Sequence, residues 1–308
     1  MPRTLCCCLW AASLFAADDA LVVEVNGDAI RVGEVARAYD AAVKGRTLTP
    51  GAEAALKQGL VARLVDERLV LANLSRQGRA VKPAEVDLAL QRLEARLTPG
   101  GFATLLKDRR MTRDDLAAEY SRRMTWQRYL DEKTTDENLQ KFFEKYRREF
   151  DGTELRVAHI LWKLPEDCPP EKLAAAKQAA ADVRAEIIAK KISFAAAAQK
   201  VSQAPTAVDG GGIGWIRRRD PMPESFSRVA FGLQTGDVSA PVVSPVGVHL
   251  IHCLEEKAGV KTRQDVVDEL KPAVAEYLFA ALARQERERT PPPTIRYVDS
   301  AARPQEAP

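Results

Sequence analysis

Histidine is the side chain that most readily binds metals or exchanges protons near neutral pH, and this sequence holds only three. His249 and His252 stand three residues apart in GVHLIHCL, and His159 lies in RVAHILW, about ninety positions earlier. Such imidazoles can converge on a metal ion, exchange protons or brace a sheet. The elements that carry them decide which of these roles is open.

The segment GVHLIHCL is rich in apolar and β-branched residues and follows a turn at Pro245 to Gly247, which predicts a strand. Side chains alternate along a strand, so His249 and His252 point to opposite faces and cannot share one metal ion. On a helix they would share a face, and a metal-dependent enzyme would become the better interpretation. As a strand, the segment predicts no metal site, and the sequence predicts no other cofactor.

His249 can instead meet His159 if their two strands are neighbours. Two neutral imidazoles on adjacent strands can share an N–H···N hydrogen bond, in which one ring donates and the other accepts. A pair of this kind serves as a structural brace as readily as a catalyst, and the residues alone favour the brace.

The elements around the histidines predict a compact α+β unit of about a hundred residues. LRVAHILWKL is a run of strand formers, and PEDCPP ends it. An alanine-rich helix from about Glu171 to Lys191 and a shorter helix around Phe194 to Val201 follow. The glycine-rich DGGGIGWI, a short helix near Phe226 to Phe231, and the strands APVVS and GVHLIHCLE complete the unit.

The rest of the chain is mainly helical. LVVEVNGDAIRV predicts a hairpin that turns at Asn26-Gly27, and helical patterns run from Gly33 to Phe150. After Gly259 a further helix runs through VVDELKPAVAEYLFAALARQ, and TIRYV predicts a final strand. That helix carries an apolar stripe, which we expect to pack on the N-terminal helices. The α+β unit would then be an insertion between two parts of one helical domain.

Residues 1–17 have the features of an export signal, with Arg3 followed by an apolar stretch from Leu5 to Phe15 and small residues near a cut. We therefore expect an exported protein of the periplasm or cell envelope; a lipid anchor on one of the early cysteines is the weaker alternative. Removal of the signal leaves Cys168 and Cys253, for which a disulfide or two separate thiols are both open.

The composition argues against two classes of partner, nucleic acids and the membrane interior. The 46 basic and 43 acidic side chains leave a formal charge of +3, which gives no electrostatic footprint of a nucleic-acid binder. No other long apolar run exists, so we expect no stable membrane insertion. Residues 299–308 have the composition of a disordered tail.

Four fragments occur in an order and spacing that resemble a parvulin-type peptidyl-prolyl isomerase domain: RVAHIL, SFAAAAQKVS, GGGIGW and MPESFSRVAFGLQTGDVSAPVVSPVGVHLIHCLE. The N-terminal VVEVNGDAIRV, the helical region and the returning C-terminal helix resemble envelope foldase-chaperones of the SurA and PrsA type. The resemblance implies an α+β fold in which a four-stranded antiparallel sheet with surrounding helices is inserted in a mainly helical chaperone domain. The implied segments are a chaperone domain at 20–150, the parvulin domain at 152–257, and a helix and strand at 262–298 that pack back on the first.

The resemblance also implies the site. The catalytic positions fall on His159, His249 and Ser244. The apolar pocket for the proline ring falls on Ile213, Met222 and Phe226, with Phe226 as its floor and Met222 as an adaptable wall. The implied partners are unfolded or extended polypeptide clients with X-Pro bonds.

Three positions depart from the pattern of the family. Ala204 stands where a cysteine or aspartate is common, Gly212 replaces an acidic residue, and Ile216 replaces an aromatic one. Loss of a polar group at Ala204 removes a hydrogen-bonding partner of the histidine pair, so we expect weakened activity. Two functions follow: an isomerase that is also a chaperone, or a non-catalytic holdase that keeps the fold. The basic run Arg217 to Arg219 favours a solvated loop over a surface that attracts acidic clients.

Overall fold

The computed structural model describes residues 20–165, 168–299 and 302–303. The expected export signal at 1–17 lies outside this range, as does most of the tail at 299–308. One compact unit runs to Thr135 and resumes at Ala273, and the other is Asp136–Pro272. The domain boundaries expected from the sequence, 20–150, 152–257 and 262–298, stay predictions.

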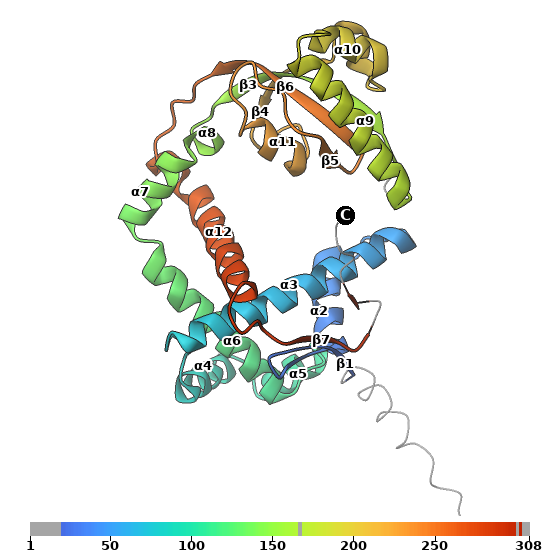
Figure 1. The fold of residues 1–308 in the computed structure, drawn as a ribbon. Helices are drawn as coiled ribbons and strands as arrows, with labels where there is room; N and C mark the ends of the chain where they lie inside the picture. Colours follow the sequence, from blue (N-terminus) through green and yellow to red (C-terminus); the bar gives the residue numbers. More distant parts are fainter. Residues whose placement is uncertain (1–19, 166–167, 300–301, 304–308) are drawn as a thin grey trace, which may run out of the picture. The chain divides into compact units, whose positions relative to one another are not determined.

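The first unit contains a small antiparallel sheet with strand order β2-β1-β7, of which β1 and β7 are labelled in Figure 1. Strands β1 (Leu21–Val25) and β2 (Asp28–Arg31) form the expected hairpin, with φ of 50° at Asn26 and 87° at Gly27. Positive φ at both central residues gives the turn that matches the twist of the paired strands. The expected C-terminal strand is present as β7 (Ile295–Tyr297), which pairs with β1.

Helices make up most of this unit. They are α2 (Val32–Val43), α3 (Pro50–Arg76), α4 (Pro83–Ala95), α5 (Gly101–Asp108) and α6 (Arg113–Lys133), with the C-terminal part of α12 (Val267–Arg287). The apolar stripe of α12 packs on α3 and α6 in one buried cluster: Val70, Leu74, Tyr129, Phe279, Leu282 and Ala283. The helix that follows the α+β unit in the sequence therefore completes the core of the first helices.

A buried cation ties the hairpin to the helices of this unit. The guanidinium of Arg68 on α3 donates to both carboxylate oxygens of Glu34, at 2.8 and 2.7 Å, and lies 3.1 Å from the carboxylate of Asp28. Its side chain is 2% exposed. A charge this deeply buried is tolerated only when it is paired and hydrogen-bonded.

The second unit carries the four-stranded antiparallel sheet that the resemblance implies, with strand order β4-β3-β6-β5 (Figure 1). The strands are β3 (Glu154–Lys163), β4 (Gly212–Arg217), β5 (Val242–Ser244) and β6 (Gly247–Lys257). The helices are α7 (Asp136–Lys145), α8 (Arg147–Phe150), α9 (Pro170–Ile188), α10 (Phe194–Val201) and α11 (Glu224–Ala230). Two short 3-10 helices, η1 (Pro205–Asp209) before β4 and η2 (Gln264–Val266) before α12, also belong to this unit.

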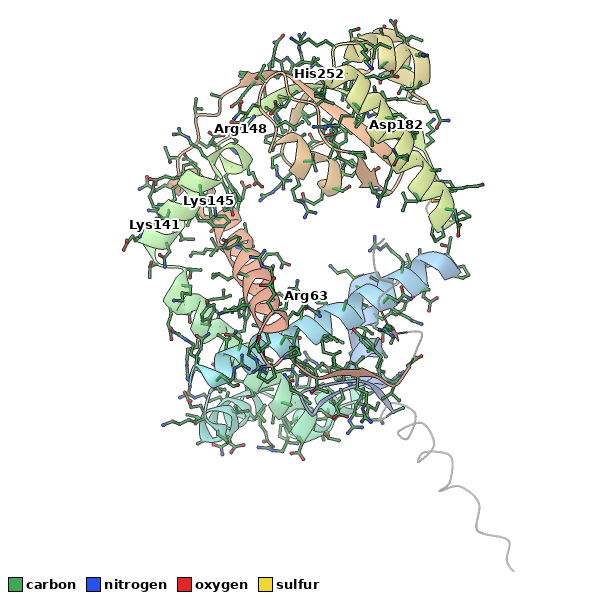
Figure 2. The ribbon with its side chains drawn as sticks, in the orientation of Figure 1. Arg63, Lys141, Lys145, Arg148, Asp182 and His252 are labelled. Carbon is green, nitrogen blue, oxygen red and sulfur yellow. The ribbon has the colours of Figure 1, made fainter. Side chains whose placement is uncertain are left out.

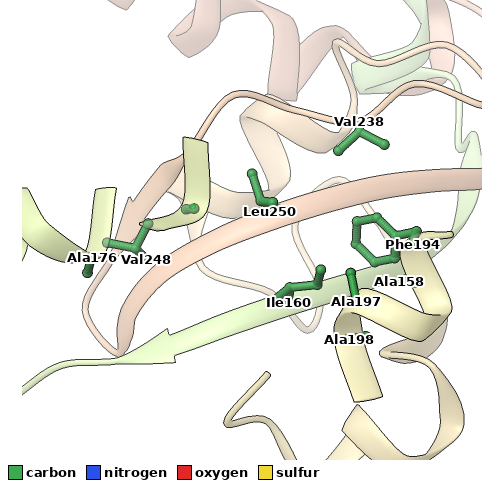
Figure 3. Packing of buried hydrophobic residues seen from close by; sticks show 10 residues of the cluster. Ala158, Ile160, Ala176, Phe194, Ala197, Ala198, Val238, Val248 and Leu250 are labelled. Carbon is green, nitrogen blue, oxygen red and sulfur yellow. The ribbon is translucent and has the colours of Figure 1, made fainter. Parts of the chain in front are cut away.

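Different helices pack on the two faces of this sheet. On one face, Ala158, Ile160, Val248 and Leu250 pack against α9 and α10, as Figure 3 shows for part of this cluster. On the other face, Leu155, Val157, Ile251 and Cys253 pack against Phe226 and Ala230 of α11. Alternation along β3 and β6 sends successive side chains to these two separate cores.

The glycine-rich stretch becomes the edge strand β4, whose pairing with β3 shifts register between Val157 and Ala158. Gly211, just before it, has a φ of 84°, and its carbonyl accepts a 2.8 Å hydrogen bond from the His159 amide. A Cβ at Gly211 would overlap the carbonyl oxygen of His159. Glycine is required here because the chain passes directly over the backbone of His159.

Within the part of the chain that the structure describes, no helix combines the length and apolar character needed to cross a membrane.

Candidate functional site

The expected histidine pair is present on the sheet face covered by α11. Strands β3 and β6 place His159 opposite Ile251 and His249 opposite Leu161, so the two histidines are diagonal neighbours on one face. Their Nδ1 atoms are 3.2 Å apart, and their rings are stacked with centroids 5.4 Å apart. The hydrogen-bonded contact expected from the strand pattern is confirmed, whereas the role of the pair is untested.

Ser244 extends this pair into a chain of three groups. Its hydroxyl lies 2.7 Å from Nε2 of His249, accepts from the Val246 amide at 3.2 Å, and lies 3.4 Å from the Gly247 carbonyl. A hydroxyl has one hydrogen to donate, and the 2.7 Å contact has the length of a good O–H···N bond, whereas 3.4 Å is long. We therefore assign the Ser244 hydrogen to His249 Nε2.

That assignment fixes the tautomers of both imidazoles. If Nε2 of His249 accepts from Ser244, its Nδ1 carries the hydrogen and donates to Nδ1 of His159. The neutral ring of His159 then carries its own hydrogen on Nε2, which the pair does not use. His159 is 9% exposed and His249 2% exposed, so His159 is the outer member of the pair.

Burial keeps both rings neutral. Loss of solvent lowers the pKa of His249 to about 4, with a further contribution from the adjacent His159. Burial also lowers the pKa of His159 below its usual value. Neither partner is a carboxylate that would favour the imidazolium form. At neutral pH the site therefore presents polar groups without a net charge.

The expected apolar residues lie on the same face. Phe226 of α11 meets both imidazoles edge to face, with centroid distances of 6.1 Å to His159 and 5.4 Å to His249. Ile213 and Met222 are half-buried against the cluster that contains Phe226. The ring of Phe226 is 0% exposed, so it is covered in this structure and a ligand reaches it only after its cover moves.

His252 lies on the opposite face, as the strand alternation predicts. Its ring packs against Phe194 of α10 at a centroid distance of 4.9 Å, and its position is labelled in Figure 2. The ring is half-buried, and burial lowers its pKa. His249 and His252 do not converge on one site.

The three departures from the family pattern have different surroundings. Ala204 is buried directly before η1, and its amide donates to the Ser202 hydroxyl at 3.3 Å. Gly212 is exposed at the start of β4. Ile216 is buried in the core under α11. The side chain of Ala204 therefore offers the buried region no polar group.

The basic run begins at Arg217, the last residue of β4; Arg217 and Arg219 are exposed, as expected of a solvated loop, whereas the Arg218 side chain is largely buried. Arg217 donates to Glu154 at 2.9 Å, and Arg219 pairs with Glu269. Arg218 donates to Glu149 at 3.0 Å and makes two hydrogen bonds to Glu224, at 2.7 and 2.8 Å. Its side chain is 12% exposed. Each arginine is matched by a carboxylate of the same unit, which argues against a patch that recruits acidic clients.

The structure resolves the question left open for the cysteines: Cys168 and Cys253 are both free thiols. Among residues 20–165, 168–299 and 302–303, no group of three or more histidine, cysteine, aspartate or glutamate side chains could hold a metal ion.

Comparison with known families matches both parts of the chain. Residues 159–255 match the family model described as the PPIC-type PPIase domain, and residues 7–130 match the SurA-like N-terminal domain. The first match contains the histidine pair, Ser244 and the three positions expected to form the pocket. The second covers the hairpin and the helices α2 to α5 with most of α6.

Several curated relatives of this chain are named Chaperone SurA. That of Methylobacillus flagellatus is 28% identical over 213 residues, which is 66% of this chain and 48% of the relative. That of Chromohalobacter salexigens is 25% identical over 266 residues, 82% of this chain and 60% of the relative. That of Xanthomonas euvesicatoria pv. vesicatoria is 35% identical over 104 residues, 34% of this chain and 22% of the relative. The chain spans about half the length of such relatives.

Proposed function

We propose that this chain, which carries a PPIC-type PPIase domain and a SurA-like N-terminal domain, isomerises X-Pro bonds in extended polypeptide clients and acts on them as a chaperone. The observation that carries the proposal is the hydrogen-bonded series Ser244–His249–His159, held against Phe226 on one face of the sheet. Hydrogen-bonding groups and an apolar side chain therefore lie next to each other on this face of the sheet.

The reaction needs no nucleophile and no metal. Rotation about the peptide bond faces a barrier of about 18–20 kcal/mol because it loses amide resonance. The planar amide has charge separated between oxygen and nitrogen, and the twisted amide has less. An apolar, water-poor site therefore favours the twisted form over the planar one, which is the differential binding that lowers a barrier.

The residues of the site suit this chemistry. We propose that Phe226, Met222 and Ile213 hold the proline ring and exclude water. His159 and His249, with the pKa of both lowered by burial, stay neutral and place no charge next to the amide. Ser244 fixes the tautomer of His249, and the Nε2 hydrogen of His159 is then a donor that the pair does not use.

The chaperone part of the proposal is supported by the helical unit and by the name Chaperone SurA that the curated relatives carry. We propose that the clients are unfolded or extended polypeptides with X-Pro bonds. Export to the periplasm or cell envelope is part of the proposal and is supported by the sequence of residues 1–17.

A second function, a holdase without catalysis, is favoured by two observations. The position that commonly carries a polar partner for the pair is the buried Ala204, and the ring of Phe226 is fully covered. A protein of this kind would bind extended chains on the same surface without accelerating proline isomerisation.

A proline-peptide assay on the full chain separates the two. Isomerisation faster than the uncatalysed rate, lost on Phe226→Ala and reduced on His249→Ala, supports the isomerase. His252→Ala is the matched control, because it removes a histidine of the same strand from the opposite face. A wild-type rate equal to the uncatalysed one refutes catalysis, and suppression of client aggregation, followed by light scattering, then tests the holdase.

A further inference from the structure

The helix that carries Phe226 is held at both ends by two consecutive residues of another helix. That helix, α8, precedes β3 and lies upstream of residues 159–255, the segment that matches the isomerase family. Its residues Arg148 and Glu149 belong to the same compact unit as α11. No residue of α8 is assigned a part in the site by the comparisons.

Arg148, labelled in Figure 2, holds the C-terminal end of α11. Its guanidinium donates to the carbonyl of Phe231 at 3.2 Å and to that of Leu233 at 2.8 Å. Phe231 is the C-cap of α11 and Leu233 lies two residues beyond it, so Arg148 binds the chain where it leaves the helix, at the end where a cation is favourable. The other arm of Arg148 pairs with Glu256 at the end of β6, at 2.8 Å, which anchors the guanidinium to the sheet.

Glu149 holds the N-terminal end of α11 through one intermediate. Its carboxylate accepts from Arg218 at 3.0 Å, and Arg218 makes a two-pronged contact with Glu224, the first residue of α11. Planar guanidinium–carboxylate contacts of this type fix orientation as well as distance. The hydrogen bond from Arg218 also lowers the pKa of Glu224, so this contact persists well below neutral pH.

The C-terminal end of α8 is itself held by hydrogen bonds. The buried Asp151 accepts from the amide and the hydroxyl of Thr153, at 2.9 and 2.6 Å. Its carbonyl accepts from the amide of Lys261 at 2.9 Å, and the Thr153 hydroxyl accepts from the amide of Gly259 at 3.1 Å. The chain that leads into the sheet is thereby bonded to the chain that leaves it, so α8 cannot shift independently of the strands.

We propose that Arg148 and Glu149 are positioning residues of the isomerase site, which set the placement of α11 and through it that of Phe226. The proposal deepens the proposed function and rests on it for its catalytic consequence. The apolar packing of Phe226 and Ala230 keeps α11 on the sheet, but because such packing is non-directional it does not fix the exact position of the helix. The two polar contacts at its ends are what specify the position of the ring edge against His159 and His249.

Two variants of the full chain test this. Arg148→Ala removes both carbonyl contacts, and Glu149→Gln keeps the size of the side chain while it removes the charge that faces Arg218. We expect each to lower kcat/KM for a proline peptide about tenfold, since small misplacements at a site cost one to two powers of ten. Arg148→Lys, which keeps a donor for the carbonyls, should restore part of the rate. Arg156→Ala is the matched control, because Arg156 pairs with Glu255 away from α11.

A second readout does not depend on catalysis. The sequence contains three histidines, so their ring C–H signals in a proton NMR spectrum are few and can be assigned by substitution. Because the ring of Phe226 meets His159 and His249 edge to face, a shift of α11 moves their signals. We expect both signals to move in Arg148→Ala and Glu149→Gln, with circular dichroism unchanged, while the His252 signal stays.

The outcomes separate this proposal from the proposed function. Inactive wild-type protein whose His159 and His249 signals still move in the variants refutes the isomerase and supports the positioning. Active wild-type protein with unchanged histidine signals and unchanged kcat/KM in both variants refutes the positioning alone. If Arg148→Ala does not fold, Glu149→Gln decides between these results.

Discussion

Protonation of His249 should destabilise the second unit at mildly acidic pH. The folded protein lowers the pKa of this imidazole to about 4, whereas a histidine in an unfolded chain has a pKa of about 6.5. Between these values the unfolded chain binds more protons than the folded one. Stability from this group is therefore complete above about pH 6.5 and is lost as the pH falls toward 4.

The expected size follows from the same two values. At pH 5 the unfolded imidazole lies about 1.5 units below its pKa, and each unit is worth about 1.36 kcal/mol. The folded imidazole gains almost nothing at this pH. Protonation of this one residue should therefore remove about 2 kcal/mol of stability between pH 7 and pH 5, a large share of a typical total of about 5–15 kcal/mol.

Urea unfolding of the wild type and of His249→Gln, each at pH 7 and pH 5, measures this. In a Trp126→Phe background the tryptophans of the described residues are Trp162 and Trp215, both in the second unit, so their fluorescence follows that unit. The acid-induced loss of stability should be about 2 kcal/mol smaller in His249→Gln. His252→Gln should change it less, because a backbone hydrogen bond at Gly236 offsets part of the effect of burial on the pKa of His252. Equal losses in the wild type and His249→Gln, or an NMR titration of His249 near pH 6.5, would refute the reasoning.

Three further predictions concern stability. Gly211→Ala should lower the free energy of unfolding by more than about 2 kcal/mol, because the new Cβ overlaps the His159 carbonyl at a φ of 84°; a change below about 0.5 kcal/mol in urea unfolding contradicts it. Arg68→Met should lower the free energy of unfolding by about 3 kcal/mol because it leaves Glu34 without its closest cation. Arg63→Met on the same helix removes an exposed pair with Glu276 and should lower it by about 1 kcal/mol or less. Similar losses of stability for both variants in thermal melts refute the buried pair as the cause. Ser244→Ala should cost about 1 kcal/mol in the second unit and shift the His249 ring nitrogen signals, and unchanged signals would show that Ser244 does not set the tautomer.

Much of the site could be predicted because it follows from local patterns. Alternation along GVHLIHCL predicts that His249 and His252 face opposite sides, and the register of β3 and β6 confirms it. The contact between His159 and His249 needs only that the two strands be neighbours. The hairpin at Asn26-Gly27 and the helices follow from turn residues and periodicity in the same way.

Several contacts could not be predicted because they join residues that lie far apart in the sequence. Arg217, Arg218 and Arg219 pair with Glu154, Glu149 and Glu269, which lie about fifty to seventy residues away, although Arg218 also binds the nearby Glu224. Nothing near the arginines in the sequence marks those carboxylates. The packing of His252 against Phe194 also joins residues far apart in the sequence. The glycines of β4 hide a strand because glycine has a low strand propensity, although an edge strand next to a bulge accommodates it.

The covered ring of Phe226 limits how a proline could enter the proposed site. If α11 is held at its N-terminal end through Arg218 and at its C-terminal end by Arg148, the helix cannot swing away to expose the ring. One side chain that can move is Met222, which is half-buried beside the cluster and lies outside the helix. An unbranched thioether changes rotamer at little cost, whereas Ile213 is β-branched and stiff. Uncovering by Met222 would admit a proline ring while the edge of Phe226 keeps its place against the two imidazoles, so rigid support of α11 and access to its ring are compatible.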